Sequence, residues 1–165
     1  MRLAERLALL LGRLSAWSFP VIALMMGYEV VARYAFRAPT FWAHEIAGVI
    51  GAITFVLGGA YCMAEGSHMR VTLLIDRWSG LRRRAAEALA LICGATFLLG
   101  LTVAMWGIVE RNVLRFDAAG AWTPERSGSS WNTPAPALLK VTLLFGAALF
   151  LAVVIVHLVR LVRAR

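Results

Sequence analysis

The residues of this chain that could do chemistry gather near the ends of long apolar runs. Glu29 and Arg33 are four residues apart, so on a helix the carboxylate and the guanidinium can neutralise each other. Other charged or titratable residues fall at the same end of neighbouring runs: His44, Glu45, Glu110, Arg111 and Lys140. Ionisable groups near a bilayer need a partner or a function. This pattern indicates either local salt bridges at the membrane interface or a polar network between helices or subunits.

The sequence predicts no catalytic site and no metal site. The motifs HExxH and GxSxG are absent, as is a glycine-rich phosphate loop, and Cys62 and Cys93 form no CxxC pair. A b-type haem between helices needs two histidines that face each other at one depth. His68 and His157 share one side of the membrane, but His68 lies beyond the end of its apolar run. This placement argues against haem, and the lack of a charged residue in the middle of any run argues against a transporter that works by itself. A small haem-binding redox protein and a stand-alone channel or exporter are kept as alternative functions.

The composition excludes a soluble enzyme. Of the 165 residues, 61% are hydrophobic and 16% are charged, whereas soluble domains are about 45–50% apolar and about 25% charged. A disordered regulator is excluded by the same apolar content. The net charge is +8, and the basic residues that produce it lie between the apolar runs. Basic residues in such positions determine the topology of a membrane protein. We therefore expect no nucleic-acid partner.

Four apolar runs are long enough to cross a bilayer. They cover about residues 14–32, 41–64, 85–109 and 137–159, and a helix of about 20 residues spans the hydrocarbon core. Backbone groups in lipid must be satisfied internally, so each run is predicted to be a helix. The first run contains Glu29 and lacks a clear cleavage site, so it is a retained span and not a secretion signal. The predicted fold is an all-α integral membrane domain of four transmembrane helices, formed by residues 1–165.

The basic residues predict the orientation of these spans. Eleven of the 17 basic residues lie in the N-terminal arm, in the connection between the second and third spans, and in the C-terminal tail. The other six lie on the opposite side. Because cytoplasmic segments carry the excess of arginine and lysine, both termini are predicted to be cytoplasmic.

The connection between the second and third spans has a pattern of its own at about residues 70–82. Its apolar residues fall near one face of a helix, and arginines surround them. This favours an amphipathic helix lying in the membrane interface, although an ordinary basic loop is the alternative. The residues expected at the membrane surface are Arg70, Arg77, Trp78, Arg82, Arg83 and Arg84.

Three motifs carry a resemblance to a known family. The chain has RYxFxxP from Arg33 to Pro39, then WxxE from Trp42 to Glu45, and then EGxHxRVxLLxD from Glu65 to Asp76. In these motifs it resembles the small membrane subunit, of the DctQ type, of tripartite ATP-independent periplasmic (TRAP) transporters. A weaker match follows at WNTPAP and Lys140. The chain departs from the pattern at Thr72, where an aspartate is common.

The resemblance implies a partner-dependent role in secondary active transport. In this family a large membrane subunit holds the substrate and sodium sites and moves as an elevator, and a soluble periplasmic protein delivers the substrate. The small subunit would enlarge the stationary scaffold and help to form the docking face, in the inner membrane of a bacterium and in contact with its lipids. No cofactor is expected in this chain, since sodium-coupled symport would use sodium bound in the large subunit. The candidate subunit-interface residues are Arg33, Trp42, Glu45, Glu65, His68 and Lys140.

Overall fold

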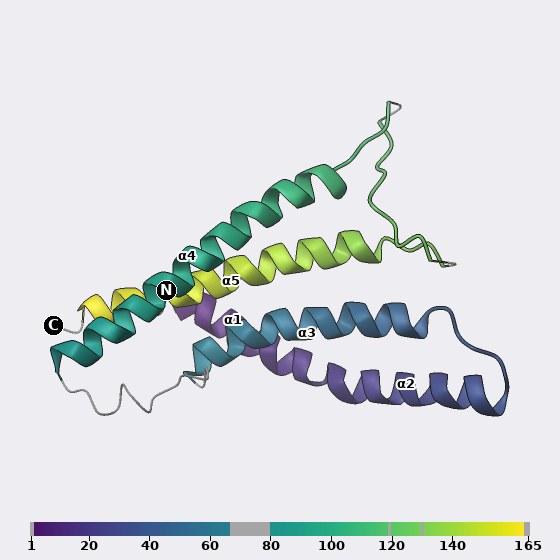
Figure 1. Cartoon of the computed structure of the whole chain (residues 1–165), viewed down its shortest axis with the longest axis horizontal. Helices are drawn as coiled ribbons and strands as arrows, with labels where there is room; N and C mark the ends of the chain where they lie inside the picture. The colour runs from purple at the N-terminus through teal and green to yellow at the C-terminus, as the bar shows by residue number, and fades with distance from the viewer. Residues whose placement is uncertain (1, 67–79, 119, 130, 164–165) are drawn as a thin grey trace.

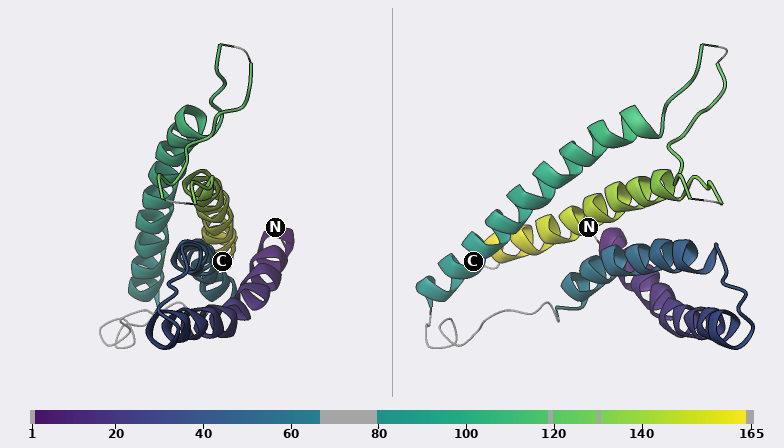
Figure 2. Two further views of the ribbon diagram at one scale, coloured as in Figure 1. Left: turned by 90° about the vertical axis from the view of Figure 1, so that its right-hand side faces the viewer. Right: turned by 45° about the vertical axis from the view of Figure 1, so that its right-hand side comes forward.

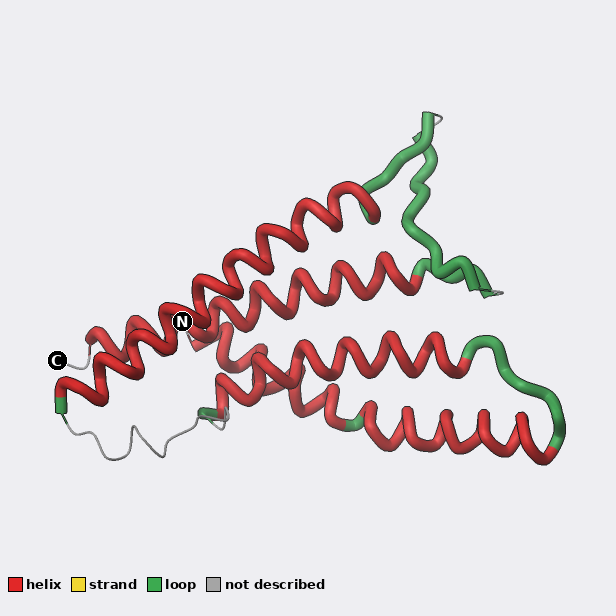
Figure 3. The backbone as a smooth tube through the Cα atoms, in the orientation of Figure 1, coloured by secondary structure: helices red, strands yellow, loops and turns green. Residues whose placement is uncertain are grey.

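A computed structural model describes residues 2–66, 80–118, 120–129 and 131–163, and these residues form five α-helices and no β-strand (Figure 1, Figure 3). The helices are α1 (Arg2–Ala16), α2 (Ser18–Ala35), α3 (Ala43–Glu65), α4 (Leu81–Asn112) and α5 (Ala135–Arg163). Most of the predicted interfacial segment at 70–82 lies outside the described residues. Its last two residues, Leu81 and Arg82, begin α4.

Four helical segments are long and apolar enough to cross a membrane, which confirms the predicted all-α fold with four candidate spans. They are Leu3–Ala35, which combines α1 and α2, followed by α3, α4 and α5. The helices extend beyond the apolar runs. The 32 residues of α4 measure about 48 Å, compared with a hydrocarbon core of about 30 Å. The additional turns carry arginines, which belong at the polar interface.

The order of the spans defines two ends of the molecule. The start of α1 and the end of α5 lie at what we call the terminal end, together with the end of α3 and the start of α4. The α2–α3 and α4–α5 connections lie at the opposite end, which we call the loop end (Figure 1). The cytoplasmic location of the terminal end remains a prediction.

The first span is broken at Trp17, between α1 and α2. Pro20 has no N–H to donate to the Ala16 carbonyl, and its ring crowds that position, so the helix cannot continue straight. The Ser18 hydroxyl donates to the Ser15 carbonyl at 2.5 Å and lies 2.5 Å from the Thr54 hydroxyl of α3. The bend is therefore attached to the middle of the second span.

The spans form an open layer and not a closed bundle. α5 packs against α3, and α3 packs against α2, whereas α4 packs only against α5 among the described helices. Seen from one end, α5, α3 and α2 lie in a row, with α1 on one side of it and α4 on the other (Figure 2). α1 and α4 cover these two sides only in part, because at most 33% of the residues in the most apolar stretch of any span are buried, so much of the surface is open to lipid or to another protein.

The main apolar core is formed by residues of α1, α3 and α5, with Leu98 joining it from α4. Its buried members are Ala8, Leu57, Ala60, Met63, Leu98, Leu149, Val153 and Val154. Two glycines permit the closest helix contacts. A Cβ on Gly12 would lie 2.4 Å from the Tyr61 Cβ, and one on Gly146 would lie 2.0 Å from a Val56 methyl group. Small residues at such crossings let membrane helices approach closely.

Candidate functional site

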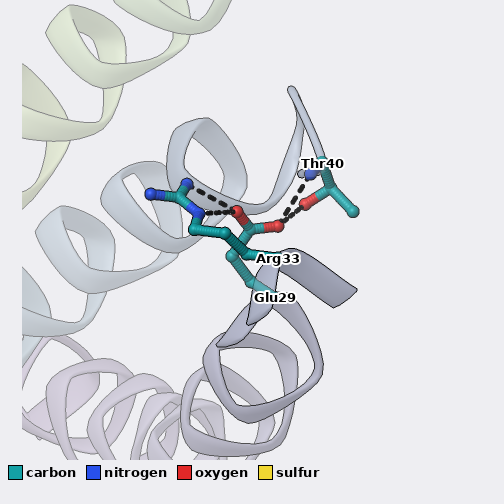
Figure 4. A network of polar contacts seen from close by, with 3 residues as sticks. All are labelled: Glu29, Arg33 and Thr40. Carbon is teal, nitrogen blue, oxygen red and sulfur yellow. Dashed lines mark hydrogen bonds and ion pairs between the residues drawn. The ribbon is translucent and has the colours of Figure 1, made fainter. Parts of the chain in front are cut away.

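The first polar network of the loop end is centred on the buried carboxylate of Glu29. The side chain of Arg33 donates to its Oε1 from Nε at 3.1 Å and from Nη2 at 2.6 Å. The other oxygen accepts a bond from the Thr40 backbone N–H at 2.9 Å and a second from the Thr40 hydroxyl (Figure 4). The predicted Glu29–Arg33 pair is thus confirmed. Because Thr40 follows the turn, the same carboxylate also holds the α2–α3 connection against α2.

The α2–α3 connection adopts a conformation that needs this support. Arg37 has a positive φ of 52°, which is uncommon for a residue with a side chain. The Ala38 N–H donates back to the Ala32 carbonyl at 3.0 Å. Beyond the turn, the Trp42 ring stacks on the Tyr28 ring with their centroids 6.2 Å apart. Trp42 is therefore held in place on one side, while 37% of its surface stays exposed.

The second loop-end network ties the long α4–α5 connection to α3 and α5. The carboxylate of Glu45 accepts bonds from the hydroxyls of Ser129, at 2.7 Å, and of Thr133. Glu125 forms an ion pair with Lys140 of α5. Within the connection, the Trp122 Nε1–H donates to the Val113 carbonyl at 2.7 Å. Backbone hydrogen bonds, such as those from the Thr123 N–H to the Arg115 carbonyl and from the Ser127 N–H to the Thr133 carbonyl, act together with these side-chain bonds to fix the shape of this segment.

A third network lies at the terminal end, between α1 and α5. Arg160 Nη2 lies 2.5 Å from Oε2 of Glu5, and His157 Nε2 lies 3.8 Å from the other oxygen. On α4, Arg83 and Glu87 form the ion pair that their spacing predicts, at 3.2 Å. On α3, the Tyr61 hydroxyl donates to Glu65 at 2.9 Å.

The structure divides the predicted subunit-interface residues between separate places. Arg33 and Trp42 support the α2–α3 connection, whereas Glu45 and Lys140 hold the α4–α5 connection. Glu65 lies at the terminal end of α3, and His68 lies outside the described residues. The side chain of Arg33 stays 46% exposed although it pairs with Glu29, so it can still contact another protein. The subunit-interface role of all six residues remains a prediction.

The predicted membrane-surface residues are described only in part. Arg70, Arg77 and Trp78 lie outside the described residues. Arg82, Arg83 and Arg84 are exposed in the first turn of α4, at the terminal end. Their contact with lipid headgroups remains a prediction.

Several residues of these networks were not foreseen from the sequence. Thr40 lies 11 residues from Glu29, and Ser129 and Thr133 lie 84 and 88 residues from Glu45. No periodic pattern links positions at such separations. The partners of the Glu5–Arg160 pair are 155 residues apart. Glu5 lies on α1, most of which precedes the predicted first span at 14–32.

The described residues form neither a cluster of metal ligands nor a cavity lined mainly by polar side chains. Within these ranges, no group of three or more His, Cys, Asp or Glu residues could hold a metal ion. A cavity of about 250 Å³ opens between α3 and α5, just to the loop-end side of the Val56–Gly146 contact. Its lining is apolar except for Thr142 and Lys140, and the Lys140 ammonium pairs with Glu125.

Comparison with known families identifies most of the chain. Residues 22–164 match the model of the family described as tripartite ATP-independent periplasmic transporters, DctQ component. No curated protein matches the chain. The matched region includes α3, α4, α5 and all but the first turn of α2, and it leaves out α1.

Proposed function

Because the chain belongs to the DctQ family, the small component of tripartite ATP-independent periplasmic transporters, we propose that it is the subunit that widens the static scaffold of the large membrane subunit. We further propose that its loop end helps to dock the periplasmic substrate-binding protein. Substrate and sodium would bind to the other chains of the complex. The location would be the inner membrane of a bacterium, with the terminal end in the cytoplasm.

The open layer of helices is the observation that best supports the scaffold role. In the most apolar stretch of each span, only 6% to 33% of the residues are buried within the chain. The spans therefore leave most of their surface for lipid or for another protein. A layer that packs against a large membrane subunit along one face would widen it. A wider frame resists tilting while the mobile part of the transporter crosses the bilayer.

The loop-end networks support the docking role. Both connections at this end are held by side-chain bonds to Glu29 and Glu45, so the surface is fixed before any partner arrives. Preorganised surfaces bind with a smaller entropic cost than mobile ones. Arg37, Arg115, Trp122 and Trp131 are exposed at this end. They provide charge and aromatic area for contact with a soluble protein.

Co-purification tests the proposed function directly. The chain is co-expressed with the large membrane subunit of its own transporter, and one of the two carries an affinity tag. In mild detergent we expect both subunits to elute together in a fixed ratio. If the chain elutes alone although the large subunit is well expressed, the proposal is wrong. Solute transport by this chain alone in liposomes, or a haem absorption band in the purified protein, would support one of the alternative functions instead.

A further inference from the structure

The helix α1 lies before the part of the chain that matches the family, and it has three distinct faces. Its sequence, RLAERLALLLGRLSA, carries small residues four apart at Ala4, Ala8 and Gly12. A row of leucines runs along another side of the helix, and arginines run beside this row. Such a division of small, apolar and basic residues is typical of a helix with one protein-facing side and one side that meets the membrane interface.

The small face of α1 packs against the rest of the chain. Ala8 is 1% exposed, and Gly12 lies against the ring and the Cβ of Tyr61 on α3. Glu5, the only acidic residue of α1, turns toward α5 and pairs with Arg160. These contacts fix the rotation of α1 about its axis. They also remove its negative charge from the outward side.

The outward face of α1 presents leucine and arginine. Leu3, Leu7, Leu10 and Leu14 are 39% to 70% exposed. Arg6 and Arg13 are also exposed, and neither has a hydrogen-bond or ion-pair partner among the described residues. They are two helical turns apart, a separation of about 10 Å along the axis. The outward face therefore carries two positive charges beside an apolar row.

The position of α1 along the span brings this face to one leaflet. The hydroxyl of Ser18 meets Thr54, near the middle of α3, and Gly12 meets Tyr61, near its terminal end. α1 thus runs along the terminal-end half of α3. α1 alone has 15 residues, about 22 Å, and it runs outward from the bend near the middle of α3, so it is longer than half of the roughly 30 Å hydrocarbon core. The start of α1 must consequently reach the headgroup region of that leaflet.

We propose that the outward face of α1 binds anionic phospholipid in the terminal-end leaflet. The guanidinium groups of Arg6 and Arg13 would contact lipid phosphates, and the leucine row would contact the acyl chains. Arginine matches phosphate oxygens through paired N–H bonds, and its long stem can follow apolar surface while its head reaches the interface. The absence of an acidic side chain on this face favours negative lipid over zwitterionic lipid. This inference does not depend on the proposed transport function.

Lipid retention by the full-length chain tests the proposal. The purified protein in mild detergent is titrated with phosphatidylglycerol or with phosphatidylcholine of the same acyl chains, and bound lipid is counted by native mass spectrometry. The test variant is R6Q/R13Q. The matched control is R37Q/R115Q, which removes two exposed arginines from the loop end. We expect the test variant to lose affinity for phosphatidylglycerol by about thirtyfold, since it lacks two basic residues and each one near an anionic surface contributes about 1 kcal/mol. The control should retain nearly all of it.

Two further measurements keep the result interpretable. R6K/R13K preserves both charges and should retain most of the selectivity, and thermal unfolding in detergent shows whether each variant is folded. Equal binding of the two lipids to the unmodified chain would overturn the proposal, as would unchanged phosphatidylglycerol binding in R6Q/R13Q. If that variant binds lipid normally but no longer co-purifies with the large subunit, the face contacts the protein partner and the lipid proposal is wrong.

Discussion

Gly146 of α5 packs directly against Val56 of α3, and the two helices can approach this closely only because glycine has no side chain. A Cβ built on Gly146 would be 2.0 Å from Val56 Cγ1 and 3.3 Å from Val56 Cβ. On the terminal-end side of this contact, α3 and α5 share the main apolar core. On its loop-end side, they enclose the apolar cavity. The pair therefore sets the distance between the two central helices of the layer.

Replacing this glycine by alanine is expected to separate α3 from α5. Gly146→Ala should lower the free energy of unfolding by about 1–3 kcal/mol, because an extra carbon in a packed contact forces its neighbours to move. The measurement is thermal or denaturant unfolding of the full chain in mild detergent. The double variant G146A/V56A makes room for the new carbon, so it should recover part of the loss.

Gly100 provides the matched control for this prediction. A Cβ at Gly100 would meet nothing within 4 Å. Gly100→Ala should leave stability unchanged or raise it slightly, since alanine is the better helix former. If the two alanine variants unfold alike, the close contact between Gly146 and Val56 does not limit the approach of the helices.

Removing the Glu29 carboxylate is expected to release the α2–α3 connection. Glu29→Ala deletes the acceptor that binds both the N–H and the hydroxyl of Thr40. The turn at Arg37, with its positive φ, would lose its anchor. Limited trypsin digestion should cut after Arg37 several-fold faster than in the unmodified chain. Glu110→Ala, which removes an exposed carboxylate at the same end, should not change this rate. Equal cleavage in all three proteins would show that Glu29 does not hold the connection.

How far the sequence predicts this structure depends on the range of the interaction. The spans follow from runs of apolar residues, and Glu29–Arg33 and Arg83–Glu87 follow from their spacing on one helix. Both signals are local. The open layer could not be predicted, because spans that are apolar on every side do not reveal which of their faces meet. The contacts of Glu45 with Ser129 and Thr133 depend on how an irregular connection folds back, and composition does not encode this.

The long α4–α5 connection should loosen when Glu45 is removed. Glu45→Ala leaves the Ser129 and Thr133 hydroxyls without their shared acceptor, although the Glu125–Lys140 pair remains. We expect faster trypsin cleavage after Arg126, by several-fold, and faster hydrogen exchange between residues 120 and 133. His44→Ala is the control, because the side chain of this neighbour is exposed and forms no hydrogen bond or ion pair with the described part of the chain. An unchanged cleavage rate in Glu45→Ala would mean that the connection is ordered by other contacts.

Trp42 provides the test of the loop-end contact with the large subunit. Its ring stacks on Tyr28, yet 37% of the residue stays exposed, and Arg33 at the same end keeps 46% of its side-chain surface exposed. Aromatic and arginine side chains often dominate binding at protein interfaces. Trp42→Ala should therefore reduce the yield of the co-purified complex by about tenfold while membrane insertion is kept. Phe55→Ala serves as the control, since Phe55 is a large exposed side chain in the middle of α3, 83% accessible. Limited trypsin digestion after Arg37 distinguishes lost contact from a disturbed turn: a normal digestion rate with a low complex yield assigns Trp42 to the interface. A normal complex yield would remove Trp42 from the interface and leave the membership of the family unaffected.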